Sequence, residues 1–525
     1  MHSWKSWKLG LLLLSLVGGC TVGPNYHTPR TPLPARFSAT AQPATTQAAT
    51  QPAPVEVDLT RWWQTFNDPA LNRLIDEAIA RNLDVRLANA RIREARAQLE
   101  FNRAALFPTA DSSASYSRSL FSKNAFAPIA TSTGQTSGGT TGTGTGGTTG
   151  SGGTTGTGNT TGSSGTTNTP FSLGRTNLYR AGFDAGWEID VFGGTRRAIE
   201  AARYSLQAQV EARRSTLVTL LSEVAQNYII LRGLQHEEQV VRNNLAAQRS
   251  TLNLQQVKLE AGLTNNLTIA QAQALAASTE SELPTLDTQI QQTIQRLAVL
   301  LDRDPTSIER ELNGPASIPV GPASIPPGLP SDLVRRRPDV RQAERQLAAA
   351  TANIGVAKAD LFPKFSLTGS LGLESLQLKT LANSASAFWS FGPTVSWRIF
   401  DAGQIWANVH VQNARQEEAL IQYRQAIIQS LADVENALTA YNREQARNSS
   451  LRRAVEANRQ AVALSKQLNE AGVVDFLNVL TAQQSLYQSE DQLAQSDQTV
   501  STDLIALYKA LGGGWETTEQ AVSAR

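Results

Sequence analysis

The sequence predicts an α+β membrane protein that is internally duplicated, and three observations predict it. Asn82–Pro108 and Arg337–Pro363 align without a gap and end in the same Leu-Phe-Pro triplet. The Glu-Ala-Gly triplet at 260–262 recurs at 470–472. In each half, runs with a two-residue hydrophobic period precede long proline-free stretches. The repeat is far longer than a solenoid unit, so we interpret it as a duplication of one architecture.

The N-terminus has the features of a lipoprotein signal peptide over residues 1–19. Lys5 and Lys8 precede an apolar run that is too short to span a bilayer. Small residues then precede Cys20, the only cysteine of the chain, and resemble a bacterial lipobox in which that cysteine is lipidated. A plain signal peptide with an incidental cysteine is the alternative. Residues 20–57, rich in Pro, Ala, Thr and Gln, are expected to form a lipidated, extended tether.

The first repeat is predicted to cover residues 58–304 and to begin with a helix. The Trp62-Trp63 pair lies at helix-like spacing from later apolar residues and is interpreted as a core or interface anchor. Asp68-Pro69 is typical of an N-cap followed by proline at the first helical position. The first repeated helix is expected to end near Phe107, because Pro108 cannot continue it.

Four runs with a period of two predict strands. Every odd position from 179 to 191 is apolar, and the even positions are polar or glycine. The pattern recurs at 365–373 and 389–399 and, more weakly, at 109–121. Each run has roughly the length that a tilted strand needs to cross a membrane. Pro393 indicates an edge strand, a bulge or an early position in its strand.

The two strands of the first half are separated by a tract of Gly, Thr and Ser. This tract covers residues 130–170 and is expected to be a flexible extracellular loop. The second half has only a short connection, at about 375–386, in the equivalent place. A position that accepts such an insertion must lie at a free surface. The tract lacks the lysine and the strand–helix frame of a phosphate-binding loop.

Long helices follow the strands in both halves. The first is predicted from about Arg196 past Glu260, which would make a rod about 100 Å long. A turn and a return helix to about Leu301, kinked at Pro284, complete the first half.

The second half is predicted to repeat this arrangement. Residues 305–330 form a proline-rich crossover, and residues 331–511 form the second repeat. Its long helix is expected from Asn413, with a return helix after the second turn. The tail at 512–525 is expected to be loose.

The composition does not support catalysis, a metal site or nucleic-acid binding. Removing Lys5 and Lys8 from the 47 Lys and Arg residues leaves 45, against 45 Asp and Glu, so there is no net charge to attract nucleic acid. Four histidines and one cysteine leave little material for a metal or thiol site. We therefore expect no enzyme and no cofactor apart from the covalent lipid on Cys20. Arg335–Arg337 is interpreted as a source of inter-helix ion pairs rather than an anion site.

Four amphipathic strands cannot close a barrel, and open strand edges are not tolerated in lipid. Several chains must therefore combine to form a pore. Three copies would give twelve strands and an open lumen, whereas two would give eight strands, which side chains fill. The sequence thus predicts a trimeric β-barrel continued by a long α-helical periplasmic barrel.

Several motifs resemble the TolC-like outer-membrane efflux proteins, in particular lipoproteins of the NodT group. The segment Cys20–Pro29 resembles their CxxGPxYxxP opening. The other matching motifs lie at 62–69, 328–333, 336–340, 397–403, 261–273 and 471–483. This resemblance covers nearly the whole mature chain. It implies an outer-membrane homotrimer with a twelve-stranded barrel that acts as the exit duct of a tripartite efflux pump.

The resemblance also implies partners. A periplasmic adaptor and an inner-membrane resistance–nodulation–division transporter would deliver drugs or other small molecules to a passive conduit. Two alternatives remain open from the sequence. One is the duct of a type I protein secretion system. The other is a lipid-anchored coiled-coil rod or adhesin, although such a rod would not need amphipathic strand pairs.

In the family, the two helical turns would be the periplasmic tips that contact the adaptor. Two ordinary glycine helix stops are the alternative interpretation. The tip residues would be Gly262, Leu263 and Thr264 in the first turn and Gly472, Val473 and Val474 in the second.

The resemblance further implies a constriction after the second turn, where TolC has rings of aspartate. The matching positions here are Asn478 and Thr481, so that carboxylate ring is absent. Asp475 is the one residue that could supply a ring, of three carboxylates in a trimer, and it could equally be a solvated loop residue.

Overall fold

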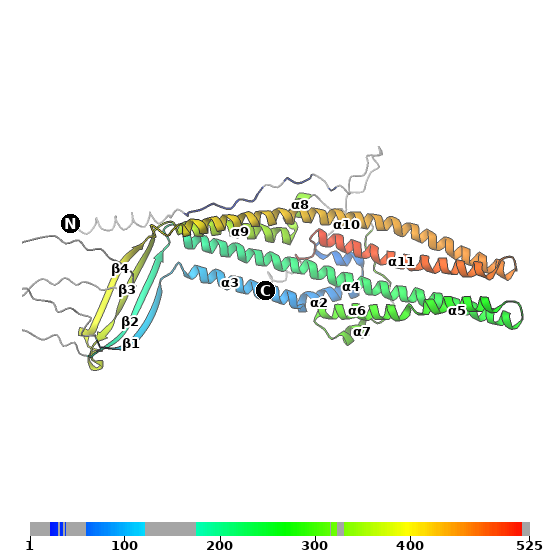
Figure 1. Ribbon diagram of the computed structural model, residues 1–525, viewed down its shortest axis with the longest axis horizontal. Helices are drawn as coiled ribbons and strands as arrows, with labels where there is room; N and C mark the ends of the chain where they lie inside the picture. The colour runs from blue at the N-terminus through cyan, green and yellow to red at the C-terminus, as the bar shows by residue number, and fades with distance from the viewer. Residues whose placement is uncertain are drawn as a thin grey trace, which may run out of the picture. The chain divides into compact units, whose positions relative to one another are not determined.

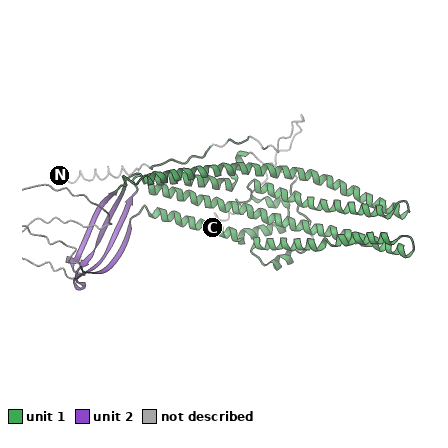
Figure 2. Cartoon of the chain, viewed as in Figure 1, with its two compact units in different colours: residues 1–106, 190–364, 396–525 green, residues 107–189, 365–395 purple. Residues whose placement is uncertain are grey.

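The computed structural model consists of two compact units (Figure 2). The helical unit contains residues 1–106, 190–364 and 396–525, and the strand unit contains residues 107–189 and 365–395. The signal peptide, Cys20, most of the tether and the tract at 130–170 lie outside the described residues. The structure describes residues 21–29, 32–34, 37, 59–120, 175–314, 317–322 and 330–516.

The strand unit is one four-stranded sheet with the order β1-β2-β3-β4 (Figure 1). Its antiparallel register pairs Tyr116 with Tyr179 and Phe183 with Leu371. The central pair, β2 and β3, joins the two halves of the chain, so the duplication builds a single sheet rather than two hairpins. The strands are β1 (Thr109–Leu120), β2 (Arg175–Ile189), β3 (Lys364–Ser375) and β4 (Ala387–Ser396), and two short 3-10 helices, η3 (Leu378–Thr380) and η4 (Ser384–Ser386), connect β3 to β4.

The sheet has one apolar and one polar face, as the period of two predicts. Opposite residues in a register share a face. Trp187 is opposite Leu367 on the apolar face, whereas Arg180 is opposite Glu374 on the polar face, with their charged groups 3.9 Å apart. Pro393 lies in β4, an edge strand that can accommodate a residue without a backbone N–H.

The helical unit divides the predicted helices differently at several points. The helix predicted to start at Pro69 is two elements, α2 and α3, and the segment with the two tryptophans before it is a separate 3-10 helix, η2. The crossover contains a helix, α7, and the second long helix begins at Gln404 rather than Asn413. The first half contains η2 (Leu59–Phe66), α2 (Pro69–Arg81), α3 (Leu83–Ala104), α4 (Gly194–Glu260), α5 (Asn266–Glu280) and α6 (Leu283–Leu301). The remainder contains α7 (Pro305–Leu312), α8 (Pro330–Arg336), α9 (Pro338–Ala359), α10 (Gln404–Glu470) and α11 (Phe476–Ala510).

Local capping explains where the early helices begin. The Asp68 carboxylate accepts hydrogen bonds from the Ala70 and Leu71 amides at 2.8 and 3.1 Å, which confirms the predicted N-cap. Asn82 then ends α2 and caps α3 through the amides of Asp84 and Val85. A second cap inside the predicted helix is the reason that it is divided.

The main core joins the two halves of the chain. Trp62 and Trp63 are fully buried, and Trp62 stacks on Tyr508 with ring centroids 5.0 Å apart, so both tryptophans are core residues as predicted. The C-terminal residues that the sequence indicated as loose also pack here as far as Glu516, and Trp515 lies 4.4 Å from the Arg214 guanidinium. The buried surface of this segment corrects the expectation for residues 512–516.

The long helices α4 and α10 run the length of the helical unit (Figure 1). Helix α4 packs on α3, α5, α6, α9 and α11, whereas α10 packs on α9 and α11. Figure 1 shows α10 at one edge of this layer and α3, α5 and α6 at the other, with both helical turns at the same end. Within the described residues, none of the helices combines the length and apolar character needed to cross a membrane.

Candidate docking site at the helical tips

The two turns that end α4 and α10 have the same backbone geometry. Gly262 and Gly472 have φ angles of +71° and +73°, in the left-handed region that glycine adopts without strain. Among the described residues, no atom lies within 4 Å of a Cβ added at either glycine. Glycine is therefore favoured here by backbone conformation and not by lack of space.

Hydrogen bonds identify both turns as Schellman motifs. In the first turn, the Leu263 amide donates to the Lys258 carbonyl at 2.8 Å. In the second, the Val473 amide donates to the Leu468 carbonyl at 2.9 Å. These bonds satisfy carbonyl groups that the helix ends would otherwise leave open. The sequence repeat thus corresponds to a structural repeat at the tips.

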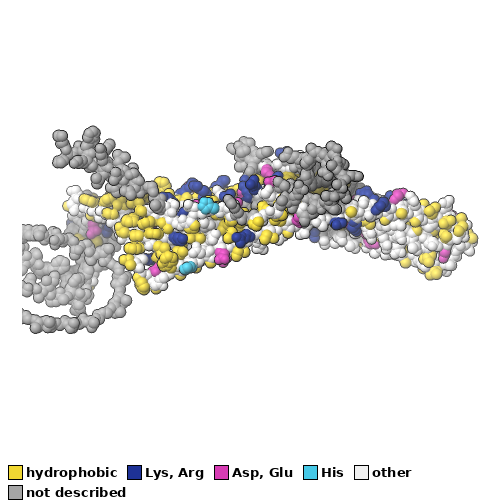
Figure 3. All heavy atoms as spheres, turned by 90° about the horizontal axis from the view of Figure 1, so that it is seen from above, with side chains coloured by type: hydrophobic (Ala, Val, Ile, Leu, Met, Phe, Trp, Pro, Cys, Tyr) yellow, Lys and Arg dark blue, Asp and Glu magenta, His cyan; other side chains and the backbone are white. Residues whose placement is uncertain are grey.

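Apolar side chains at both turns are exposed. Leu263 is 75% exposed and Val473 is 68% exposed, although a Schellman motif commonly packs the side chain at this position on its own helix. Leu267 and Leu477, one turn further on, are exposed too. In Figure 3, hydrophobic and uncharged side chains dominate this end of the helical unit. Contiguous exposed apolar residues are typical of a protein-binding surface.

A small hydrophobic cluster holds the two hairpins together behind the turns. Phe476, Val479 and Leu480 of α11 are buried with Ala272 of α5, and Leu252 of α4 packs against them. The apolar residues of α11 thus divide between two faces. One face supports the tip from within, and the other leaves Leu477 exposed.

The predicted constriction residues Asp475, Asn478 and Thr481 are all exposed in the single chain. Asp475 precedes α11, and within the described part of the chain its carboxylate makes no capping hydrogen bond. Asn265 at the equivalent place in the first turn does cap its helix, because it accepts from the Thr268 amide at 3.0 Å. The Asp475 carboxylate is therefore available at the tip surface.

A groove of about 470 Å³ lies beside the turns, between the ends of α4, α10 and α11. Lys258 and Lys466 line it together with Glu470, and Phe476 and Val479 form part of its wall. The sequence gives no sign of this groove, because its walls come from helices about 200 residues apart in the chain and no local pattern marks such a contact.

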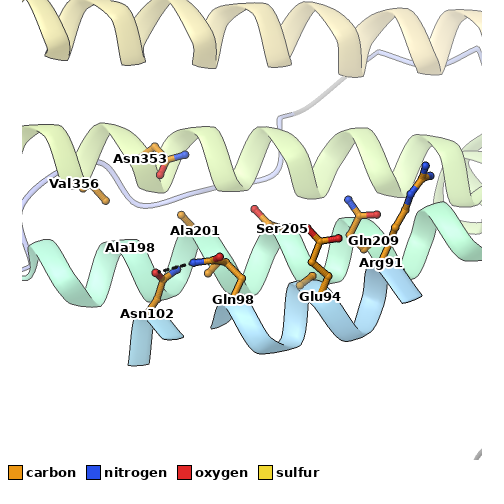
Figure 4. A pocket seen from close by; sticks show the side chains of 12 residues that line it. Arg91, Glu94, Gln98, Asn102, Ala198, Ala201, Ser205, Gln209, Asn353 and Val356 are labelled. Carbon is orange, nitrogen blue, oxygen red and sulfur yellow. Dashed lines mark hydrogen bonds between the residues drawn. The ribbon is translucent and has the colours of Figure 1, made fainter. Parts of the chain in front are cut away.

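A second cavity, of about 570 Å³, lies away from the tips (Figure 4). It is formed by α3, α4 and α9, and its lining combines polar side chains such as Gln98, Ser205 and Asn353 with small apolar ones, mostly alanines. Gln98 donates to Asn102 at 3.4 Å across one turn of α3. Within the described residues, no group of three His, Cys, Asp or Glu side chains is arranged to hold a metal ion.

The predicted lipidation residue, Cys20, lies outside the described residues. Two members of the arginine run behave as the sequence indicated. Arg337 donates to Asp339 at 2.6 Å and to Asp433 of α10 at 2.9 Å, and Arg336 pairs with Glu516 at 2.7 Å. These contacts hold α9 against α10 and the C-terminal segment.

Comparison with known proteins agrees with this fold. Residues 74–303 and 329–513 match the family described as outer membrane efflux protein. Nodulation protein T of Rhizobium leguminosarum bv. viciae is 29% identical over 99% of this chain and 96% of its own length. The solvent efflux pump outer membrane protein SrpC of Pseudomonas putida is 30% identical over 98% of this chain and 99% of its own length.

The solved structure of the outer-membrane channel OprN is 32% identical and has a TM-score of 0.80. It covers 95% of this chain, which in turn covers 100% of that channel. The residues that match the family come from both repeats and include both helical turns. The chain therefore belongs to the outer membrane efflux protein family, has the TolC-like fold and is the outer-membrane channel component of an efflux system.

Proposed function

We propose that three copies of this chain form a continuous duct, in which twelve strands make the outer-membrane barrel and the helices make a periplasmic tube. The observation that carries this proposal is the open sheet. β1 and β4 are its two edges, and an unpaired strand edge in lipid leaves backbone groups without hydrogen bonds. Pairing β4 of one copy with β1 of the next removes every edge when three copies close.

The edges of the helical layer support the same assembly. On α10, Ile428 is 67% exposed, and Ile421, two turns earlier, is also exposed. On α3, Phe101 is 73% exposed, and Leu83 and Leu87 are exposed as well. Apolar residues at this spacing make a stripe along one helix face. Packing α10 of one copy on α3 of the next would bury both stripes.

We further propose that the tips contact a periplasmic adaptor, which links the duct to an inner-membrane transporter. Exposed Leu263 and Val473 and the neighbouring groove with its lysine and glutamate groups support this role. A surface with apolar anchors and a polar rim is typical of a protein interface. The resistance–nodulation–division class of transporter is proposed from the sequence resemblance.

The duct itself is proposed to be passive, without catalysis, and to conduct drugs or other small molecules. The name of SrpC refers to solvent efflux, which supports small, apolar compounds as cargo for this chain. The lipid on Cys20 is proposed as a further anchor for each copy, since the sequence before Cys20 resembles a lipobox.

The assembly can be tested with Ile428→Glu, because a charge at an exposed position is harmless unless another copy covers it. Native mass spectrometry should show a trimer for the wild-type chain and a monomer for Ile428→Glu. Gln422→Glu on the same exposed helix is the matched control and should remain trimeric. In planar bilayers, the trimeric proteins should conduct ions and the monomeric variant should not. A conducting monomer, or a trimer of Ile428→Glu with full conductance, would contradict the proposal.

A further inference from the structure

The nine residues after Cys20 lie in close contact with the helical unit. The Val22 amide donates to the Phe192 carbonyl at 3.1 Å. A Cβ added at Gly23 would lie 2.4 Å from the Cα of Gly355 in α9, and one added at Gly355 would lie 2.9 Å from the Val22 carbonyl oxygen. Two backbones therefore meet at a pair of glycines, an approach that side chains would prevent. We call residues 21–29 the N-terminal arm.

Arg197, in the first turn of α4, binds this arm from within the fold. Its side chain is buried, and the residue is only 3% exposed. The guanidinium donates to the carbonyl of Val22 at 3.1 Å, to the carbonyl of Gly23 at 3.3 Å and to the side-chain oxygen of Asn25 at 2.7 Å. It also pairs with Glu200 of its own helix at 2.7 Å.

The hydrogen-bonding needs of the Arg197 guanidinium explain why it depends on the arm. A buried guanidinium is costly unless its donors are satisfied. Glu200 supplies one acceptor from the helix, and three acceptors come from the arm. Arg197 is therefore satisfied only when the arm is seated. The planar, forked guanidinium suits this role because it can bind several oxygens at once, which a lysine ammonium cannot do in the same geometry.

The far end of the arm is held by α9 and α4 together. The hydroxyls of Tyr26 and Thr28 both donate to Glu344 of α9, at 3.2 and 3.1 Å. The Tyr26 ring packs edge-on against Tyr204 of α4, with centroids 6.0 Å apart. The arm thus connects a helix of the first half with a helix of the second.

We propose that the groove of α4 and α9 around Arg197, Gly355 and Glu344 is a receptor for the mature N-terminus, and that Arg197 is the residue that locks the arm in it. This fixes the position of Thr21, the residue that follows the proposed lipid site. A Cβ added at Gly193, the N-cap of α4, would lie 2.9 Å from the Cα of Thr21, so Thr21 is held against the start of this helix. The start of the N-terminal arm is thereby held at the N-terminus of α4.

The proposal that the arm carries a lipid rests on the proposed function, whereas the docking of the arm does not. Within the described residues the contacts come from the arm itself, between Thr21 and Thr28, and the proposed docking does not include the lipid. The arm should therefore dock equally well in wild-type protein and in Cys20→Ser. If labelled fatty acid is absent from the wild-type chain while the arm docks, the lipidation proposal fails and the receptor stands.

Docking can be measured on the full chain in membranes with the photo-crosslinker p-benzoylphenylalanine in place of Tyr26, since both are aromatic. Illumination should give adducts with peptides of α4 and α9. Arg197→Gln should lower their yield about tenfold, because several hydrogen bonds to a charged group are lost. Arg203→Gln, on an exposed arginine of the same helix, is the matched control and should leave the yield unchanged.

A second variant separates docking from folding of the helical unit. Asn25→Ala changes only the arm, at an exposed residue, and should also lower the adduct yield. Its effect should be small in the Arg197→Gln background, because the two residues share one contact. Full adduct yield in Arg197→Gln, additive effects of the two changes, or loss of docking in Cys20→Ser would each overturn the proposal.

Discussion

Gly262 and Gly472 adopt the same left-handed conformation at the ends of two helices that lie in different halves of the chain. Both follow the same Glu-Ala pair and precede an exposed apolar residue. The two repeats therefore share both the backbone turn and the exposed apolar residue that follows it. This relationship makes the tips the best place to separate a structural role from a binding role.

The double variant Leu263→Asp with Val473→Asp should abolish efflux and leave the trimer intact. Both side chains are exposed, so the change in the free energy of unfolding should stay within about 0.5 kcal/mol, whereas a charge in an apolar interface weakens binding. Dye efflux in a strain without its own channel measures the effect. Leu378→Asp, at a residue 65% exposed in η3, is the control. Loss of the trimer would mean that the turns are structural stops only.

A cysteine at Thr264 or Val474 should crosslink to the adaptor in intact cells. Both residues lie within the turns and are half-buried, so a short crosslinker there reports direct contact. A cysteine at Thr380, between β3 and β4, should give no adaptor adduct. If a cysteine at Thr380 gave as much adaptor adduct as a cysteine in the turns, the turns would not be the docking site.

Gly262→Ala should destabilise the first turn by about 1–2 kcal/mol, because an alanine in the left-handed region strains its backbone. Gly262→Asn should cost less, since asparagine tolerates this conformation. The space around the position is open, so side-chain bulk alone predicts no difference. Hydrogen exchange of the tip amides can rank the three proteins. Equal protection in the two variants would show that φ is not the determinant.

Glu237 of α4 should make the stability of the helical unit depend on pH. Burial, together with the nearby Asp491 and Glu282 carboxylates, raises the pKa of Glu237 to about 7, and burial also raises the pKa of Asp491 in α11. The Tyr487 hydroxyl donates to Glu282 beside them. The folded chain thus binds a proton more tightly than the unfolded chain. The resulting stabilisation is full below the ordinary carboxyl pKa and is lost as pH rises through about 7.

The melting temperature should therefore be higher at about pH 5 than at about pH 8. Glu237→Gln mimics the protonated acid and should reduce this difference. Glu238→Gln, which removes the partner of Arg242, should retain it. If the melting temperature of Glu237→Gln changed with pH as much as that of the wild type, other groups would be the cause of the pH dependence.

Cys20→Ser should abolish incorporation of labelled fatty acid and still allow the trimer to form. The proposed assembly contacts lie at the edges of the sheet and of the helical layer, and neither includes residue 20. Metabolic labelling followed by native electrophoresis measures both outcomes. Label retained in the variant would refute the assignment of Cys20 as the lipid site.

The sequence by itself determined the features that depend on neighbouring residues. The period of two fixed the strands and their two faces, and the proline-free runs indicated the long helices. The Asp68-Pro69 pair located a helix start, and the two Glu-Ala-Gly triplets located the turns. Each of these signals is local, because hydrophobic period, capping and glycine conformation act over a few residues.

Only the tertiary structure decided which distant segments meet. It pairs β2 with β3 across the duplication, forms the groove between α4 and α10, and packs Trp515 onto the core. It also seats the N-terminal arm on Arg197, where backbone carbonyls complete a buried guanidinium. Such contacts depend on packing and on shared hydrogen bonds between residues far apart in the chain, and a single sequence carries no local pattern for them.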